Sequence, residues 1–339
     1  MLIHPKLIYT DVENLLKNKQ FTWLVTGAAG FIGSHLTERL LGLGQKVIGL
    51  DNLSTVFRKN IESLEDLPEY KNLFTFIQAD ISNEKAFATH IKTVDFVLHQ
   101  AALGSVPRSI QEPEIFHESN VNGFFHILNT SRIAGVKKIV FASSSSVYGD
   151  NPNLPKSEGM VGNPLSPYAA TKLINEFYAN SYAITYDTPV VGLRYFNVFG
   201  KRQNPHGPYA AVIPLWIQLM LDGKQVSING DGSYRRDFCY IENVIQANLL
   251  AAFSTPASHG QMFNIAVGEQ TTLLKLYEIM KEAVEATSGT KVPPPIFCDF
   301  RKGDIPHSLA SIEKAGKLLG YQPEIGLRQG LFETVKMSI

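Results

Sequence analysis

The sequence is poor in cysteine and carries no net charge. Only Cys239 and Cys298 occur among 339 residues, which is too few for a disulfide framework and fits a reducing compartment. Lysine plus arginine and aspartate plus glutamate each number 31, so no net field attracts a nucleic acid or an anionic membrane. We therefore expect a cytoplasmic protein that binds neither of them.

Long apolar runs and metal-binding patterns are also missing. No stretch approaches the ~20 consecutive apolar residues that a membrane-spanning helix needs. Residues 1–20 contain no apolar run followed by a small-residue cleavage site, which predicts that there is no signal peptide. The nine histidines show neither HxxH nor HExxH spacing and no Cys-His pattern typical of a metal site. The sequence therefore predicts no bound metal.

What the sequence does contain is an alternation of apolar strands and helices. Helical patterns run from Phe31 to about Leu43, from about 113 to 134, and onward from Ser166-Pro167, where Ser is the N-cap. Strands rich in Val, Ile, Leu and Phe are expected at 23–27, 46–51, 73–80, 94–102, 137–144 and 189–195. Near-continuous apolar strands between helices predict an α/β fold, a Rossmann doubly wound parallel sheet covered on both faces.

The length of the chain predicts more than one lobe. A chain of 339 residues exceeds what one hydrophobic core usually serves. After residue 200 the strands shorten and Gly, Pro and Arg increase, which predicts a smaller C-terminal α/β lobe for the substrate. We expect an N-terminal extension over 1–20, a Rossmann domain over 21–200 with returning segments from the C-terminal part, and the substrate lobe over 201–339.

The stretch TGAAGFIGSH places Gly27, Gly30 and Gly33 between the first strand and its helix. Such glycines permit a tight turn and close approach of a pyrophosphate, which the helix N-terminus then faces. Asp51 ends the second strand, 18 residues after Gly33, where it would bind the adenosine ribose and repel a 2′-phosphate. The pattern predicts bound NAD rather than NADP, and the alternative is a structural turn with a surface aspartate. Asp80 is a weaker candidate, either an adenine contact or a solvated turn residue.

Two tyrosines stand four residues before a lysine. In SPYAATK, Tyr168 and Lys172 share one helix face, and the ammonium would lower the pKa of the phenol so that it can accept a proton from an alcohol. Tyr277 and Lys281 have the same spacing, but no glycine loop or serine run precedes them. The order along the chain favours Tyr168 as a general base and Tyr277 as a packing residue.

Several segments, in order, resemble one family. TGAAGFIGSH, HQAAL, SSSSVYG, SPYAATK and LRYFNVFG are similar to the extended short-chain dehydrogenase/reductase family of nucleotide-sugar enzymes, from about residue 20 to 335. Within it, HQAALGSVPRSI, YAAVIP, SINGDG, RDFCYIEN and GDIPHSLA resemble the bacterial UDP-N-acetylglucosamine 4-epimerases. The resemblance implies a Rossmann domain that holds NAD, a C-terminal lobe that closes over a UDP-sugar, and a homodimer formed through a four-helix bundle.

The resemblance also assigns roles within the serine run at 143–146. Ser144 falls where the family carries the Ser or Thr that hydrogen-bonds the sugar 4-hydroxyl, and Lys172 would bind the nicotinamide ribose. Related 4,6-dehydratases carry Asp-Glu where this chain has Ser145 and Ser146, and related decarboxylases keep the Glu. Neither serine can act as a carboxylate acid or base, which leaves reversible oxidation at C4. The two serines are expected to contact the sugar; polar filling of the strand end is the alternative.

The resemblance completes both binding sites. The NAD site is expected to comprise Gly27, Gly30, Phe31, Ile32, Gly33, Asp51, Asn52, Ser54, Thr55, Asp80, Ile81, Gln100, Ala101, Ala102, Asn120, Tyr168, Lys172, Tyr195 and Val198. The UDP-sugar site is expected to comprise Gly104, Ser105, Val106, Ser144, Ser145, Ser146, Tyr168, Asn197, Ala211, Val212, Arg236, Arg301, Asp304 and Ser308. Arg236 and Arg301 would hold the substrate pyrophosphate, with surface salt bridges as the alternative. Asp304 would bind the uridine ribose and Asn197 a phosphate.

Ser308 is expected to decide which sugars fit. Related 4-epimerases confined to UDP-glucose and UDP-galactose carry Tyr at this position, whereas a small residue resembles enzymes that also admit 2-acetamido sugars. A phenol ring would fill the space that an acetamido group needs. The alternative is that Ser308 is the N-cap of a helix that begins near Ala310.

Together these features predict an NAD-dependent 4-epimerase that interconverts UDP-N-acetylglucosamine and UDP-N-acetylgalactosamine through a 4-keto intermediate, for the supply of surface polysaccharide precursors. UDP-glucose and UDP-galactose are expected to be slower substrates. Three alternatives stay open: a UDP-N-acetylglucosaminuronic acid 4-epimerase, a nucleotide-sugar dehydratase or decarboxylase, and a non-catalytic NAD-binding regulator.

Overall fold

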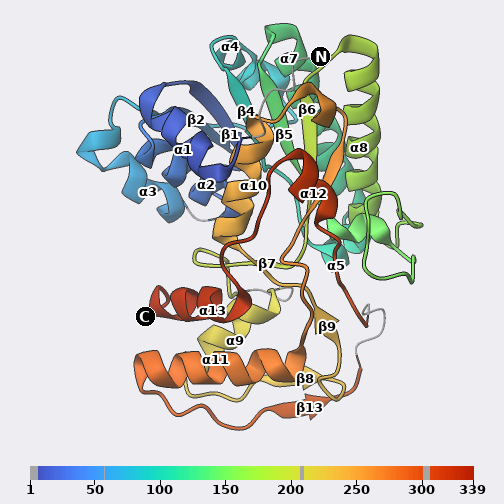
Figure 1. Cartoon of the computed structure of the whole chain (residues 1–339). Helices are drawn as coiled ribbons and strands as arrows, with labels where there is room; N and C mark the ends of the chain where they lie inside the picture. The colour runs from blue at the N-terminus through green and yellow to red at the C-terminus, as the bar shows by residue number, and fades with distance from the viewer. Residues whose placement is uncertain (1–6, 57, 207–209, 301–305) are drawn as a thin grey trace.

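A parallel sheet built from the apolar strands forms the centre of the molecule (Figure 1). In the computed structural model, which describes residues 7–56, 58–206, 210–300 and 306–339, seven strands form one sheet in the order β11-β6-β5-β4-β1-β2-β3. Its strands are β1 (Thr22–Thr26), β2 (Lys46–Asp51), β3 (Phe74–Gln78), β4 (Phe96–His99), β5 (Lys138–Ser144), β6 (Val190–Tyr195) and β11 (Met262–Ile265). The predicted Rossmann fold is confirmed, and the sheet order reverses between β1 and β4, where such sheets bind ligands.

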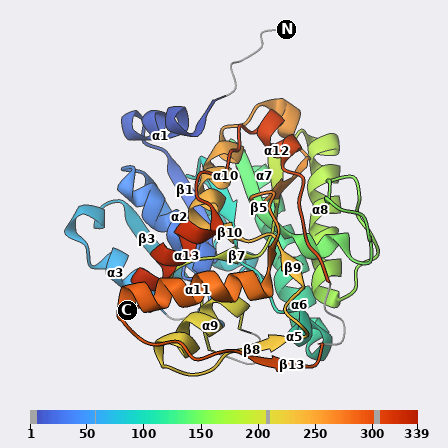
Figure 2. The ribbon, with the colours of Figure 1, turned by 60° about the horizontal axis from the view of Figure 1, so that its bottom comes forward.

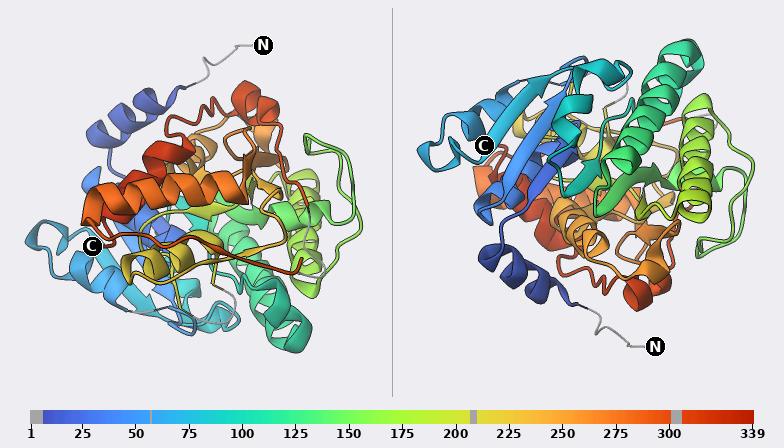
Figure 3. Two further views of the ribbon diagram at one scale, coloured as in Figure 1. Left: turned by 90° about the horizontal axis from the view of Figure 1, so that it is seen from below. Right: turned by 90° about the horizontal axis from the view of Figure 1, so that it is seen from above.

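Helices cover both faces of this sheet because successive side chains of a strand point to opposite faces. Val25 of β1 packs in one core with Leu36 and Ile245, whereas its neighbour Leu24 packs in another core with Leu128. The helices of the first core include α1 (Tyr9–Asn18), α2 (Phe31–Gly42) and α10 (Ile241–Ala252). Those of the second include α4 (Ala88–Ile91), α7 (Gly123–Ala134) and α8 (Pro167–Tyr186). Both views of Figure 3 show α8 on the side of the molecule away from α1.

The helix expected over 113–134 is interrupted in the structure. It consists of α6 (Pro113–His117), one π-helical turn (Glu118–Asn122) and α7. Within the π turn, the buried Asn120 amide binds the backbone of Leu103 and the hydroxyl of Thr171. The π turn therefore carries the residue that joins this helix to α8. Single π turns of this kind occur frequently at functional sites.

Short strand pairs and three helices form the smaller α/β lobe, which lies below the sheet in Figure 1. The pairs are β8 (Ser227–Asn229) with β13 (Ile296–Cys298), β9 (Arg235–Arg236) with β12 (Thr271–Thr272), and β7 (Val198–Phe199) with β10 (Cys239–Tyr240). Its helices are α9 (Val212–Leu221), α11 (Leu273–Ser288) and α13 (Leu327–Lys336). Further α-helices are α3 (Lys59–Glu65), α5 (Val106–Gln111) and α12 (Glu313–Leu318).

The N-terminal helix α1 lies at the outside of the molecule, against α10 (Figure 2). Its Val12 and Leu16 side chains are buried, so α1 adds to the first core. Among the helices that the structure describes, none is long and apolar enough to cross a membrane.

Candidate active site

The turn between β1 and α2 requires its glycines. Gly27 has φ +68°, and a Cβ atom there would lie 2.8 Å from the backbone nitrogen of Ala101. A Cβ atom on Gly33 would lie 2.0 Å from the carbonyl oxygen of Gly27. The N-cap of α2 is Gly30, which provides no side-chain cap, so the first N–H groups of the helix are left for a ligand.

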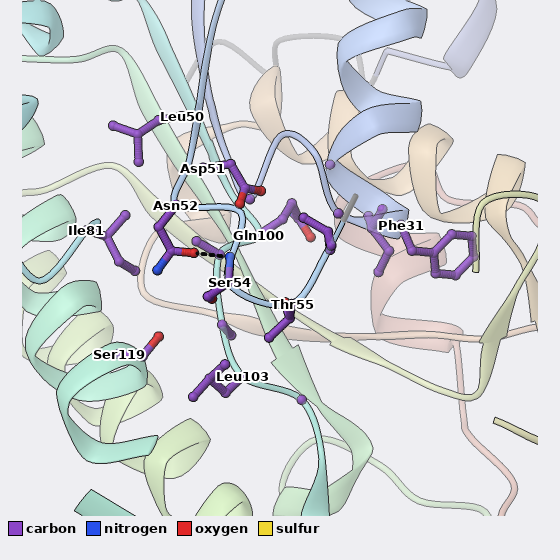
Figure 4. A pocket seen from close by; sticks show the side chains of 18 of the residues that line it. Phe31, Leu50, Asp51, Asn52, Ser54, Thr55, Ile81, Gln100, Leu103 and Ser119 are labelled. Atoms are coloured by element: carbon purple, nitrogen blue, oxygen red, sulfur yellow. Dashed lines mark hydrogen bonds between the residues drawn. The ribbon is translucent and has the colours of Figure 1, made fainter. Parts of the chain in front are cut away.

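A cavity of about 320 Å³ lies at this turn (Figure 4). The residues expected for NAD that line it are Gly27, Gly30, Phe31, Ile32, Gly33, Asp51, Asn52, Ser54, Thr55, Ile81, Gln100, Ala101 and Ala102. Gly104, expected for the substrate, lines it as well. Lining residues that the sequence reasoning missed are Leu50, Val56, Ala79, Leu103 and Ser119. Each of these residues is the direct chain neighbour of a predicted residue. Their position next to a predicted residue is therefore the sequence feature that could have identified them.

Asp51 is held beside the glycine turn by the backbone. Its carboxylate accepts hydrogen bonds from the N–H groups of Ala29 (3.0 Å) and Leu53 (2.8 Å). Burial raises the pKa of this carboxyl group, and these hydrogen bonds oppose the rise. Asp80 lies next to the cavity, where it accepts a hydrogen bond from the Asn52 amide at 2.6 Å. A glycine cradle, an uncapped helix N-terminus and a carboxylate at the end of β2 together fit a dinucleotide whose ribose is unphosphorylated at the 2′ position.

The structure brings Tyr168, Lys172 and Ser144 together. Ser166 caps α8 by accepting a hydrogen bond from the N–H of Ala169 at 3.2 Å, as its position before Pro167 predicts. The Lys172 ammonium lies 5.9 Å from the centre of the Tyr168 ring and donates to the carbonyl of Ala142 at 2.8 Å. Ser144 ends β5, and its hydroxyl lies close enough to the phenol of Tyr168 to lower the pKa of that phenol.

The electrostatics of this pair differ from the expectation. Burial raises the pKa of Tyr168, and the interaction that opposes burial comes from Ser144 rather than from Lys172. Burial lowers the pKa of Lys172 to about 8, while the charge of Glu176 acts in the opposite direction. The physical reason is that Lys172 is itself almost fully buried and directs its ammonium to a carbonyl oxygen rather than to the phenol oxygen.

The serine run divides between a strand and a 3₁₀ turn. Ser143 and Ser144 end β5, and Ser145 begins the turn that continues to Tyr148. The Ser146 hydroxyl donates to the Ser144 hydroxyl oxygen at 2.9 Å. Ser144, Ser145 and Ser146 are all half-buried, so a bound molecule could reach them.

Other predicted NAD residues lie outside the cavity lining. The Tyr195 hydroxyl donates to the Gln100 amide oxygen at 3.1 Å and so orients a side chain that does line the cavity. Asn120 holds Leu103, also a lining residue, through both backbone groups. Val198 begins β7, beyond β6.

The other predicted substrate residues that the structure describes lie in the smaller lobe, in the β6–β7 connection and around the β4–α5 connection. Ser105 caps α5, which begins at Val106, and Ala211 is the N-cap of α9, which begins at Val212. Asn197 donates to the carbonyl of Asp237 at 2.9 Å, and Arg236 donates to the carbonyl of Pro306 at 3.1 Å. Arg301 and Asp304 lie outside the described residues.

Ser308 is not a helix N-cap, so that alternative is wrong. The next helix, α12, begins at Glu313, and its N-cap is Ile312. Ser308 lies in an extended segment, where its N–H donates to the carbonyl of Arg235 at 3.0 Å and its carbonyl accepts from Gln270 at 3.5 Å. Both bonds use the backbone of Ser308.

Tyr277 occupies a structural position. Its ring is buried on α11, and its hydroxyl donates to the carbonyl of Pro293 at 2.8 Å. Among the described residues, no three His, Cys, Asp or Glu side chains gather in a way that could hold a metal ion.

Comparisons with known proteins agree with this geometry. The pattern of the NAD-dependent epimerase/dehydratase family matches residues 23–266. A UDP-glucose 4-epimerase of Mycolicibacterium smegmatis is 39% identical over 316 residues, which cover 92% of this chain and 97% of the relative. The solved structure of a UDP-N-acetylglucosamine 4-epimerase from Methanobrevibacter ruminantium, in complex with UDP-N-acetylmuramic acid, is similar with a TM-score of 0.86 and 37% identity, over 94% of this chain and 98% of that chain. A UDP-glucuronic acid 4-epimerase from Bacillus cereus, solved with UDP-glucuronic acid and NAD, has a TM-score of 0.81 and 33% identity, over 93% and 98%.

Proposed function

The chain belongs to the NAD-dependent epimerase/dehydratase family and is a UDP-sugar 4-epimerase, and we propose that its preferred substrates are UDP-N-acetylglucosamine and UDP-N-acetylgalactosamine. The observation that carries this choice of sugar is Ser308, a small residue in an extended segment whose hydrogen bonds use its backbone. We infer that a side chain as small as serine leaves room for the acetamido group of a bound sugar and offers that group a hydroxyl.

The catalytic roles follow from the side chains at the end of β5 and on α8. When bound, NAD would supply a hydride acceptor and donor for C4 of the sugar. Tyr168, in its phenolate form, would accept the proton of the C4 hydroxyl at its phenol oxygen, and Ser144, which lies beside the phenol and lowers its pKa, would hold the same substrate hydroxyl. Lys172 supplies positive charge beside the Tyr168 ring.

The serines at the strand end support epimerisation over loss of water or carbon dioxide. Ser145 and Ser146 stand where dehydratases of this family need an acid and a base, and a serine hydroxyl cannot replace a carboxylate in those roles. The presence of Tyr168, Lys172 and Ser144 in one cluster supports an enzyme over an NAD-binding regulator, because a regulator needs no general base.

We also propose that the protein forms a homodimer through α7 and α8. Ile133 on α7 and Phe177 and Ile184 on α8 expose 67%, 71% and 75% of their surface, and the last two are seven residues apart on one helix face. A second copy of the chain would cover the same residues by two-fold symmetry, which gives the predicted four-helix bundle.

Product analysis by proton NMR tests the choice of sugar. The purified protein is incubated separately with UDP-N-acetylglucosamine, with the corresponding uronic acid and with UDP-glucose. We expect the 4-epimer of the first to form with the highest kcat/KM. Faster turnover of the uronic acid would establish the second candidate, which the similarity to a UDP-glucuronic acid 4-epimerase supports. A product of lower mass would establish a dehydratase or decarboxylase instead.

A further inference from the structure

A third ionisable residue continues the series formed by Tyr168 and Lys172 on α8. Glu176 follows Lys172 by four residues, so the three side chains lie on one face over two helical turns. Lys172 is 3% exposed and Glu176 is 6% exposed. A buried carboxylate is costly unless it is paired, so its presence beside the proposed catalytic residues needs a reason.

Glu176 is held in place from two strands. Arg194 of β6 donates to both carboxylate oxygens, from Nε at 2.8 Å and from the terminal nitrogen at 2.7 Å. The hydroxyl of Ser143, at the end of β5, donates to the same carboxylate at 2.5 Å. A two-pronged arginine contact of this kind is among the strongest that a carboxylate can make, and it fixes the orientation of the group.

The guanidinium of Arg194 is in turn tied to groups other than α8. Its remaining terminal nitrogen donates to the Tyr148 hydroxyl at 3.0 Å and to the carbonyl of Glu158 at 2.8 Å. Tyr148 then donates to the Asn264 amide oxygen. The carboxylate of the ion pair therefore lies on α8, the helix that carries Lys172. The guanidinium comes from β6 of the sheet and is also bonded to Tyr148 and Glu158, which follow β5 in the chain.

Lys172 has a neutral partner. Its ammonium donates to the carbonyl of Ala142, and a carbonyl does not compensate a buried charge as a carboxylate does. Glu176, one helical turn away, is the carboxylate whose charge favours the protonated form of Lys172.

We propose that Glu176 is a positioning residue that keeps Lys172 in its ammonium form within the buried site, and that Arg194 holds the Glu176 carboxylate ionised and oriented for this task. The proposal rests on the proposed function, because that function assigns the Lys172 ammonium a place beside the Tyr168 ring. The action is through charge over one helical turn, with no hydrogen bond between the two side chains.

Tyr168, His99, Tyr148 and Arg194 lie around the pair and titrate away from pH 8. On α8, Tyr168 has its pKa raised by burial. From β4, His99 faces Lys172, and burial together with the Lys172 charge lowers its pKa to about 3. From the β5 turn, burial raises the pKa of Tyr148 to about 12. Arg194 stays charged, because Glu176 more than offsets the effect of burial on its pKa.

Two more charged groups act on the pair from a distance. Lys314 of α12 senses the charges of Glu176, Arg194 and Glu158, and burial lowers its pKa. Glu158 also accepts a hydrogen bond from the N–H of Asn264 at 2.9 Å. Neither residue hydrogen-bonds Lys172, whose pKa burial lowers to about 8.

The test replaces the whole ion pair in the full-length protein. Glu176→Leu with Arg194→Met keeps the volume and leaves no unpaired charge, and such replacements are often neutral for stability. The readout is the titration of the lysine Cε signals by NMR in protein labelled with ¹³C-lysine, without substrate. Lys172→Met assigns the signal, and Lys138→Met removes the other lysine whose pKa burial lowers to about 8.

We expect the titration midpoint of Lys172 to fall by about one pH unit or more in the double variant, and the alkaline limb of kcat to fall with it. Glu176→Asp retains the charge and should give a midpoint closer to that of the unchanged protein. Tyr148→Phe, which leaves the ion pair in place, is the matched control and should not move the midpoint.

An unchanged midpoint in the double variant would overturn the proposal and leave the ion pair a purely structural feature. A midpoint in Glu176→Asp that falls by about one pH unit or more would also overturn it, because the retained charge would then not be what matters. This criterion compares Glu176→Asp with the unchanged protein, so it decides the question even if the double variant does not fold. The NMR titration needs no turnover. A failure of the proposed function would instead appear as missing epimer in the unchanged protein.

Discussion

Two tyrosines precede a lysine by four residues, and their hydroxyl groups meet different partners. The Tyr168 hydroxyl lies beside Ser144 in a cluster with Lys172, whereas the Tyr277 hydroxyl donates to the carbonyl of Pro293. Tyr168→Phe should lower kcat by ~10²–10⁴-fold, the usual contribution of general acid–base catalysis. Tyr277→Phe should retain kcat and lose about 1 kcal/mol of unfolding free energy, the typical net value of one hydrogen bond.

Steady-state kinetics and urea unfolding of the two variants, side by side, check this prediction. Each substitution removes one phenol oxygen, so the variants control for each other. Equal losses of kcat in both would show that the cluster around Tyr168 is not the catalytic one.

The size of the side chain at position 308 is expected to decide which UDP-sugars the site accepts. Ser308→Tyr adds a ring where the acetamido group would pass, and overpacking of this kind costs ~1–3 kcal/mol. Turnover of UDP-N-acetylglucosamine should therefore be lost, while turnover of UDP-glucose is spared or improved. Ser308→Ala keeps the space and removes only the hydroxyl, so it should retain the preference for the acetamido sugar. Comparable loss of both substrates in Ser308→Tyr would contradict the volume argument.

At the scale of the elements, one glutamine attaches α1 to the sheet. Gln45 is fully buried between α2 and β2, and its amide nitrogen donates to the carbonyls of Leu16 (2.6 Å), Lys19 (3.0 Å) and Leu43 (3.2 Å). Its amide oxygen accepts from the N–H of Phe21 at 2.9 Å. One side chain thus joins the end of α1 to the beginning of the sheet.

Gln45→Ala should cost at least about 2 kcal/mol of unfolding free energy, because each buried polar group left unpaired costs ~1–3 kcal/mol. Gln20→Ala is the matched control: its amide also bonds a backbone carbonyl, that of Gly44, but on the surface, so it should cost well under 1 kcal/mol. Urea unfolding measures both. Equal stability of the two variants would show that α1 is held by its apolar contacts alone.

How far the elements could be predicted depends on whether their causes are local. The strand from Lys46 to Asp51 and the helix that starts at Pro167 agree with the predicted positions, because apolar periodicity and an N-cap serine are local signals. The π turn at Glu118–Asn122 could not be predicted, since it accompanies a contact between Asn120 and Leu103, which is 17 residues away in the chain.

At the scale of the whole molecule, the exposed apolar residues of α7 and α8 predict a dimer. Phe177→Asp would place a charge in the proposed two-fold interface, where burial of an unpaired charge is unfavourable. Sedimentation should then show a monomer of 37.6 kDa, whereas the unchanged protein should sediment at twice that mass. Phe297→Asp is the control: this phenylalanine is also exposed, but it lies on β13 in the smaller lobe. A dimer that survives Phe177→Asp would place the interface elsewhere.

The sequence by itself determined the Rossmann fold, the glycine turn and the order of the proposed catalytic residues, because strand periodicity, glycine spacing and helix caps act over a few residues. Only the tertiary structure decided that Glu176 meets Arg194, that burial rather than Lys172 dominates the pKa of Tyr168, and that Ser308 caps no helix. These outcomes depend on which distant segments pack together and how much water they exclude, and no local pattern records that.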